Sequence, residues 1–300
     1  MLLLKYLIFC AKIRQKALKG TMMNDKNNSI IIDDLKDFDI RHILDCGQIF
    51  RYTKLDEGKY MVFSKDKRCV VEQSNDKAEI SFDSEKDRDY FWHYFDLDTN
   101  YSVIKSTLED KPLMKEAVKY GHGIRILNQD KWETLISFII SANNHIPRIK
   151  GIIDRLCTKL GKNMGDYYAF PTSEAMASMD EDFYKSIGAG YRAKYLEVTS
   201  RKIAEGFDLD AIDKLDGLSA NKKLCSLMGV GSKVADCILL FAYHKQDVFP
   251  VDTWIKKVYK DITGKDSLDI KKTRKDLLDI YGEDMAGFAQ QYLFFNKREN

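Results

Sequence analysis

Between Ser29 and about Phe82, short runs of apolar and β-branched residues are separated by charged turn segments such as Asp56-Glu57-Gly58. Short runs of this kind are typical of β-strands with one buried face. The pattern predicts strands at 29–32, 47–52, 59–64, 67–73 and 78–82. We therefore expect an antiparallel sheet in the first part of the chain.

From Ser84 onward the apolar residues recur at helical spacing, first at Tyr90, Phe91, Tyr94 and Phe95 and then from Trp132 to Ile140. This spacing places them on one face of a helix. The fold class that follows is α+β. We predict an antiparallel β-rich domain over residues 24–110 and a mainly helical domain over residues 111–300. Residues 1–23 contain a short apolar run and are interpreted as a leader or a non-native extension.

Two glycines separate two helical patterns, at about 219–227 and 232–243. Gly229 and Gly231 flank Val230, so a helix-turn-helix hairpin is predicted over about 219–244. Glycine tolerates positive φ and close backbone approach to a ligand. Unpaired N–H groups at the start of the second helix point at an anion. The hairpin is therefore a candidate phosphate-binding turn, although a plain helical corner would show the same pattern.

Lys233 lies in the first turn of the second predicted helix, where the helix dipole disfavours a cation. This position, together with desolvation, is expected to lower the pKa of the amine and make it nucleophilic. Cys237 lies on the same face of the helix, four residues later. Asp252 follows Pro250 and opens another amphipathic pattern, so it is predicted to cap a helix. The pattern thus indicates an amine opposed by a fixed carboxylate.

With these residues the chain resembles the helix-hairpin-helix DNA glycosylases, whose hairpin is followed at this spacing by an aspartate. The lysine and the Val-Ala-Asp-Cys run behind it are similar to the 8-oxoguanine DNA glycosylase/AP lyase family. The resemblance implies that Lys233 is a Schiff-base nucleophile and that Asp252 stabilises a cationic sugar. It also implies that the partner is double-stranded DNA containing 8-oxoguanine.

Four further segments carry the resemblance, at 46–52, 123–157, 190–193 and 286–294. In the first, Gly47 is expected to accept a hydrogen bond from the ring N–H that oxidation adds to guanine. In the last, Gln290 is expected to read the extruded base. The resemblance implies that Phe294 and Cys237 cover the two sides of this base.

The central segment, 123–157, resembles the part of these enzymes that contacts the DNA strand opposite the lesion. There the resemblance implies that Asn143 fills the base stack and that Arg148 donates to the orphaned cytosine. The match at 190–193 implies that Tyr191 wedges into the stack and that Arg192 donates to the same cytosine. Gly229, Val230 and Gly231 would contact phosphate. Two departures from the family are Trp254, where characterised eukaryotic relatives have histidine, and the segment with His145 and Pro147 beside Arg148.

The composition fits this interpretation. The chain has 300 residues, 44% of them hydrophobic, and 48 basic against 46 acidic residues give a formal net charge of only +2. Affinity for DNA must therefore come from a local patch. Residues 254–275 form one candidate, with Arg274 and lysines 256, 257, 260, 265, 271, 272 and 275.

The six cysteines, at 10, 46, 69, 157, 225 and 237, are scattered without a Cys-x-x-Cys pair. This spacing implies no metal ion, no iron-sulfur cluster and no other cofactor. It also favours reduced thiols and a cytoplasmic protein, associated with the nucleoid if the source is bacterial. The apolar run near the start is too short to cross a bilayer, and we expect a monomer without membrane contact.

Two other functions are compatible with parts of the pattern. One is a helix-hairpin-helix glycosylase that removes alkylated bases, which would share the hairpin and the aspartate. The other is a DNA-binding module without catalysis, which would explain the glycines but not Lys233, Asp252 and Gln290 together.

Overall fold

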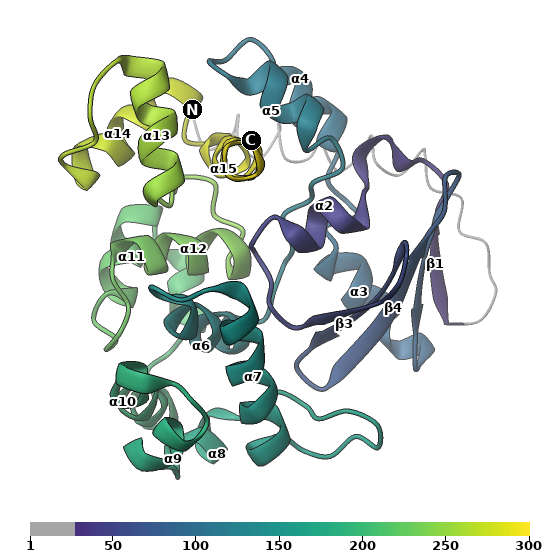
Figure 1. The fold of residues 1–300 in the computed structure, drawn as a ribbon, viewed down its shortest axis with the longest axis vertical. Coiled ribbons are helices and arrows are strands. Elements are labelled where there is room, and N and C mark those ends of the chain that lie inside the picture. The colour runs from purple at the N-terminus through teal and green to yellow at the C-terminus, as the bar shows by residue number, and fades with distance from the viewer. Residues whose placement is uncertain (1–27) are drawn as a thin grey trace.

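A five-stranded antiparallel sheet forms the first layer of the computed structural model, which describes residues 28–300 (Figure 1). The strands are β1 (Ser29–Ile32), β2 (Tyr52–Asp56), β3 (Lys59–Ser64), β4 (Lys67–Gln73) and β5 (Ala78–Phe82). Their order in the sheet is β1-β5-β4-β3-β2. Four predicted strands are confirmed at their predicted boundaries, and the α+β fold class is confirmed.

The strand predicted at 47–52 is wrong, because β2 begins only at Tyr52. The preceding residues follow a short helix, α2 (Ile40–Asp45), and turn at Gly47, whose φ is +83°. A positive φ cannot continue a strand. The side chain of Gln48 is fully buried and bonds the carbonyls of Ile43 and Arg125. These bonds hold the segment as a loop between α2 and β2.

Helices make up the remainder of the described chain. They are α3 (Arg88–Tyr94), α4 (Tyr101–Leu108), α5 (Met114–Tyr120), α6 (Lys131–Ser141), α7 (Ile146–Leu160), α8 (Ser173–Ala177), α9 (Glu181–Ser186), α10 (Ala193–Ala204), α11 (Gly217–Leu224), α12 (Ser232–Ala242), α13 (Thr253–Thr263), α14 (Ile270–Tyr281) and α15 (Ala286–Glu299). Short 3-10 turns are η1 (Leu35–Asp37), η2 (Glu85–Asp87), η3 (Gly190–Arg192) and η4 (Asp210–Lys214).

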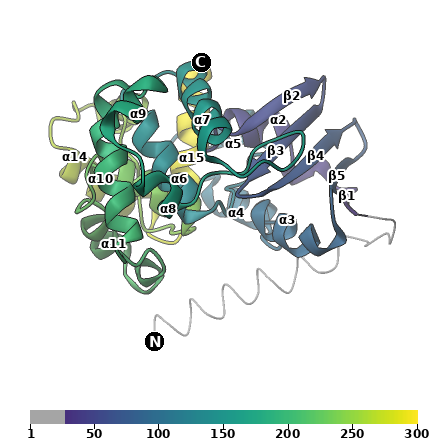
Figure 2. The same ribbon diagram turned by 90° about the horizontal axis from the view of Figure 1, so that it is seen from below.

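The buried apolar side chains form two clusters. The smaller one joins the inner face of the sheet to α2 and α3, and the larger one lies among the helices from α4 to α15. Both views show the sheet on one side of the helical body (Figures 1 and 2). The larger cluster already includes Tyr101, Ile104 and Leu108 of α4, and the division into 24–110 and 111–300 stays a prediction.

The interpretation of residues 1–23 as a leader lies outside the described residues. Over residues 28–300, no helix combines the length and the apolar character that crossing a membrane requires.

Candidate active site

One small cavity of about 60 Å³ brings together the residues predicted for the reaction and for the extruded base. They come from four separate places: the loop after α2, helix α12, the start of α13 and helix α15. The predicted residues that line it are Gly47, Lys233, Cys237, Asp252, Gln290 and Phe294. The amine and the carboxylate therefore share one site, as the proposed chemistry requires.

The glycines of the hairpin between α11 and α12 have different functions. Gly229 has a φ of +86°, and a Cβ there would lie 2.7 Å from Tyr195, so only glycine fits. Gly231 caps α12, and a Cβ there would meet no atom within 4 Å. The backbone at Gly231 is thus open to a ligand, as predicted for a phosphate-binding turn.

Val230 departs from the expected phosphate contact. Its N–H donates to the carbonyl of Leu227 at 3.2 Å, and its side chain is buried. This donor is already paired inside the hairpin of the free protein, and the expected contact of Val230 with phosphate stays a prediction. Val230 instead anchors the turn in the hydrophobic core.

Asp252 is the predicted N-cap of a helix, and the structure confirms it. One carboxylate oxygen accepts hydrogen bonds from the N–H groups of Trp254 and Ile255, at 3.0 and 2.9 Å. Such bonds fix the rotamer of a capping side chain. The rigid placement of this anion beside the cavity therefore comes from the start of α13.

Lys233 is the second residue of α12 and lies in its first turn, as predicted. Although much of the residue is exposed, its Nζ lies 5.8 Å from the centre of the Phe138 ring in the cavity wall. The predicted lowering of its pKa is wrong for the free protein. The Cys237 sulfur raises the pKa of Lys233 above its ordinary value, desolvation opposes this, and the Asp252 carboxylate adds to the increase.

The loop that carries Gly47 is held by helix α15. Gln291 donates from Nε2 to the carbonyl of Cys46 at 2.7 Å, and Arg298 donates from Nη2 to the carbonyl of Asp45. A Cβ on Gly47 would lie 3.2 Å from the Phe294 ring and 3.1 Å from Arg298. Sequence analysis missed Gln291 and Arg298, and the available signal was the position of Gln291 directly after Gln290 in the 286–294 segment.

Gln290 points an unused acceptor into the protein interior. It is 4% exposed, its Nε2 lies 3.4 Å from the carbonyl of Pro250, and its Oε1 has no hydrogen-bond partner. An unpaired buried carbonyl oxygen costs about 1–3 kcal/mol. A bound ligand with a matching donor would recover this energy.

Comparison with known proteins identifies the family. Residues 30–135 match the model of the 8-oxoguanine DNA glycosylase N-terminal domain, and residues 136–283 match that of the HhH-GPD superfamily of base excision DNA repair proteins. The chain is 32% identical over 237 residues to a probable N-glycosylase/DNA lyase of Methanothermobacter thermautotrophicus, covering 71% of this chain and 75% of that protein. The chain belongs to the 8-oxoguanine DNA glycosylase/AP lyase family.

Two further relatives agree with this family. The N-glycosylase/DNA lyase of Saccharomyces cerevisiae is 36% identical over 187 residues, which are 56% of this chain and 49% of the yeast protein. The 8-oxoguanine glycosylase/lyase of Clostridium acetobutylicum, solved with double-stranded DNA, is 39% identical with a TM-score of 0.88. That match covers 94% of this chain and 99% of the other.

In this glycosylase the residues predicted to hold the opposite strand lie in the turn between α6 and α7, at the start of α7 and in η3. Asn143 has a φ of +50° in the turn between α6 and α7. Tyr191 is 55% exposed and donates from its hydroxyl to the carbonyl of Ala142 at 3.2 Å. Arg148 is exposed and donates to the carbonyl of Gly188 at 3.2 Å. Three of the four predicted side chains thus come from one surface region.

Arg192 is the exception, because it is only 2% exposed. Its guanidinium donates to the carbonyls of Ala142, Asn143 and Ala189. These donors are engaged in the protein without DNA, and the expected contact of Arg192 with cytosine stays a prediction. Arg192 instead fixes the turn that presents Asn143.

The predicted basic patch is smaller than the sequence indicates. Arg274 is turned inward and forms an ion pair with the buried Asp236, 2.9 Å away. Lys260 and Lys272 are paired with Asp266 and Asp276. Lys257 lies over the ring of Trp254, with its Nζ 4.2 Å from the centroid. The unusual Trp254 therefore lies beside a cation at the start of α13, close to Asp252.

A larger cleft of about 960 Å³ lies elsewhere and contains none of the predicted site residues. Eight carboxylates and three lysines line it. A surface of this charge repels the phosphate backbone. Size alone therefore does not locate the DNA-binding site of this glycosylase.

Proposed function

We propose that Lys233 and Asp252 carry out the reaction of this enzyme, which is a bifunctional DNA N-glycosylase and AP lyase. It excises 8-oxoguanine from double-stranded DNA and then nicks the strand. The observation that supports the assignment is the shared cavity of Lys233, Asp252, Gly47 and Gln290. A relative that binds DNA with cytosine opposite 8-oxoguanine supports the substrate.

The first step is attack by the neutral amine of Lys233 on C1′ of the sugar, while the bond from C1′ to the base breaks. The base leaves with the bonding electrons and takes up a proton. Asp252 is fixed where positive charge develops on the sugar and stabilises it. Loss of a proton from the attached nitrogen and opening of the sugar ring then give an imine.

The second step uses this imine. It makes the proton on C2′ acidic, and removal of that proton drives β-elimination. The C3′–O3′ bond breaks, and the phosphate on the 3′ side leaves with the bonding electrons. Hydrolysis of the imine returns the free amine, so strand nicking follows base removal on the same lysine.

Recognition of the base is assigned to Gly47, Gln290, Cys237 and Phe294. The cavity of about 60 Å³ has room for a few water molecules but not for a purine. Because the Phe294 ring lies against Gly47 in the free protein, it has to move when the base enters. We propose that it then stacks on the base opposite Cys237, as the family resemblance implies.

Contact with the opposite DNA strand is assigned to Asn143, Arg148 and Tyr191. Arg192 supports the turn that presents Asn143. Filling the vacated stack offsets an extrusion cost of about a few kcal/mol. Gly229 and Gly231 of the hairpin are assigned to contact with phosphate.

We also propose a monomeric cytoplasmic enzyme, associated with the nucleoid in a bacterial cell. The cysteines of the described part of the chain are all free thiols, which supports this compartment.

Replacing Gly47 by alanine is expected to weaken binding of oxidised guanine. The residue has a φ of +83°, and the new methyl group would crowd Phe294 and Arg298. Such a backbone costs about 1–3 kcal/mol in a non-glycine residue. We expect a loss of at least about tenfold in affinity for a duplex with 8-oxoguanine, relative to a duplex with an abasic analogue.

The matched control is Gly264→Ala. Gly264 has a φ of +69° with nothing within 4 Å of a new Cβ, so it carries the same backbone strain far from crowding. Equal losses for both duplexes in Gly47→Ala, or an equal loss in Gly264→Ala, would contradict the role of Gly47 in base recognition.

The rate of imine formation is expected to rise with pH. Only the neutral amine attacks, and the pKa of Lys233 in the free protein lies above its ordinary value. At pH 6–9 the neutral fraction should increase by up to about tenfold per pH unit. Single-turnover borohydride trapping with saturating enzyme measures this rate.

Cys237→Ser provides the control for this profile. Removing the sulfur removes the largest influence that raises the pKa of Lys233, so the ascending limb should move to lower pH. A trapping rate that is independent of pH, or a shift to higher pH in this variant, would show that another group limits the step.

A further inference from the structure

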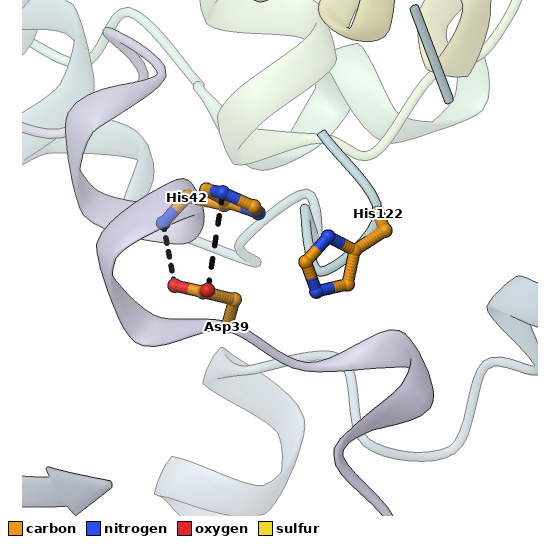
Figure 3. Close-up of side chains that lie close together, drawn as sticks. All are labelled: Asp39, His42 and His122. Atoms are coloured by element: carbon orange, nitrogen blue, oxygen red, sulfur yellow. Dashed lines mark hydrogen bonds and ion pairs between the residues drawn. The ribbon is translucent and has the colours of Figure 1, made fainter. Parts of the chain in front are cut away.

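We propose a binding site for a divalent transition metal ion of the zinc class, formed by Asp39, His42 and His122. One potential ligand atom from each residue lies within 4.8 Å of the others (Figure 3). Imidazole and carboxylate are ligands that suit zinc, nickel and related ions. The inference is independent of the glycosylase reaction, since none of the three residues lines the active-site cavity.

Asp39 offers one free oxygen to such an ion. Its Oδ1 caps α2 by accepting from the N–H groups of Arg41 and His42, at 2.9 and 3.1 Å. Its Oδ2 lies 3.8 Å from Nε2 of His42. Backbone bonds that orient a carboxylate in this way are typical support for a metal ligand.

His42 is 7% exposed and lacks good hydrogen bonds for its ring. Its Nδ1 is buried without a partner, and the distance from Nε2 to Asp39 exceeds that of a hydrogen bond. A buried ring nitrogen without a partner costs free energy. Neither ring nitrogen of His42 has a good hydrogen bond, which leaves the ring available to coordinate an ion.

His122 comes from a distant part of the chain but is held beside the other two. The N–H of Asp39 donates to the carbonyl of Gly123 at 3.0 Å. A Cβ on Gly123 would lie 2.3 Å from Asp39, so the absence of a side chain permits this approach. The two imidazole centroids are 4.8 Å apart in a T-shaped arrangement. The fold therefore brings the three side chains together before any ion binds.

Formation of the site requires a small movement. Donors around a tetrahedral zinc ion are roughly 3.3 Å apart, given bond lengths of about 2.0–2.1 Å. His122 is exposed and can rotate inward, whereas Asp39 and His42 are fixed by α2. Three protein ligands leave a fourth position for water. Such an ion would join the start of α2 to the segment after α5 (Met114–Tyr120), and α2 leads directly to Gly47.

The experiment titrates the metal-free, full-length protein with Zn²⁺ by calorimetry and with Co²⁺ by absorption. We expect one equivalent at this site, a higher melting temperature, and a cobalt spectrum without a sulfur-to-metal band. His122→Ala should weaken binding at least about tenfold. His93→Ala removes another exposed histidine outside the cluster and should bind as tightly as the wild type.

Asp39→Asn separates binding from folding, because asparagine also caps a helix. It should retain the melting temperature of the metal-free protein and lose affinity for Zn²⁺. Absence of binding, unchanged affinity in His122→Ala, or a thiolate band in the cobalt spectrum would overturn the proposal.

Discussion

Replacing Lys233 by alanine is expected to abolish covalent trapping on DNA that contains 8-oxoguanine. The amine that forms the bond to C1′ is then absent, and no other lysine lines the described cavity. Removing a catalytic nucleophile lowers rates by roughly 10³-fold or more. Borohydride trapping and strand nicking under single-turnover conditions measure the effect. Folding should be retained, because Lys233 is an exposed residue in the first turn of α12.

Lys222→Ala is the matched control for this variant. Lys222 is an exposed lysine of α11, in the same hairpin but outside the cavity. It should trap normally at saturating enzyme. An undiminished adduct in Lys233→Ala would contradict the assignment of Lys233 as the nucleophile. Equal losses of trapped adduct in both variants would point to a defect in DNA binding.

Asp252→Asn is expected to lower the rate of base removal by roughly 10²- to 10³-fold. The change removes the negative charge that stabilises the cationic sugar, which is worth several kcal/mol in a preorganised site. Asparagine still accepts the bonds from Trp254 and Ile255 that cap α13. The melting temperature should therefore change little, so the loss reports charge and not folding. Release of 8-oxoguanine from a defined duplex measures it.

Asp269→Asn tests this separation directly. Asp269 caps α14 by the same geometry, accepting from the N–H groups of Lys271 and Lys272, but it lies away from the cavity. The two substitutions should have similar effects on stability, and only Asp252→Asn should slow base removal. Similar rates in both variants would show that the carboxylate at 252 serves only as a cap.

The pKa of Lys233 shows that the position of a residue in its helix does not by itself predict its ionisation. The first turn of α12 is correctly predicted, and a helix dipole there does disfavour a cation. Yet the fold places a sulfur and a carboxylate around the same amine, and these raise its pKa. A sequence gives the position of a residue along its own helix, but not the charges that other elements bring near it.

Arg192 and Arg274 illustrate the same limit for long charged side chains. Both are counted as surface groups by their residue type, yet Arg192 holds three carbonyls of neighbouring turns and Arg274 pairs with the buried Asp236. Burial of arginine depends on whether acceptors from distant segments surround it. Periodicity along one helix contains no information about those acceptors.

The sequence by itself determined four of the five strands, the hairpin between α11 and α12, the cap at Asp252 and the family. These features depend on local spacing, on glycine at the turn and on short motifs, so neighbouring residues specify them. Only the tertiary structure decided that Gly47 lies in a loop held by α15, that Val230 and Arg192 are engaged inside the protein, and that His122 meets Asp39 and His42. Each of these depends on contacts between segments far apart in the chain, where packing and desolvation act on side chains that the local pattern cannot relate.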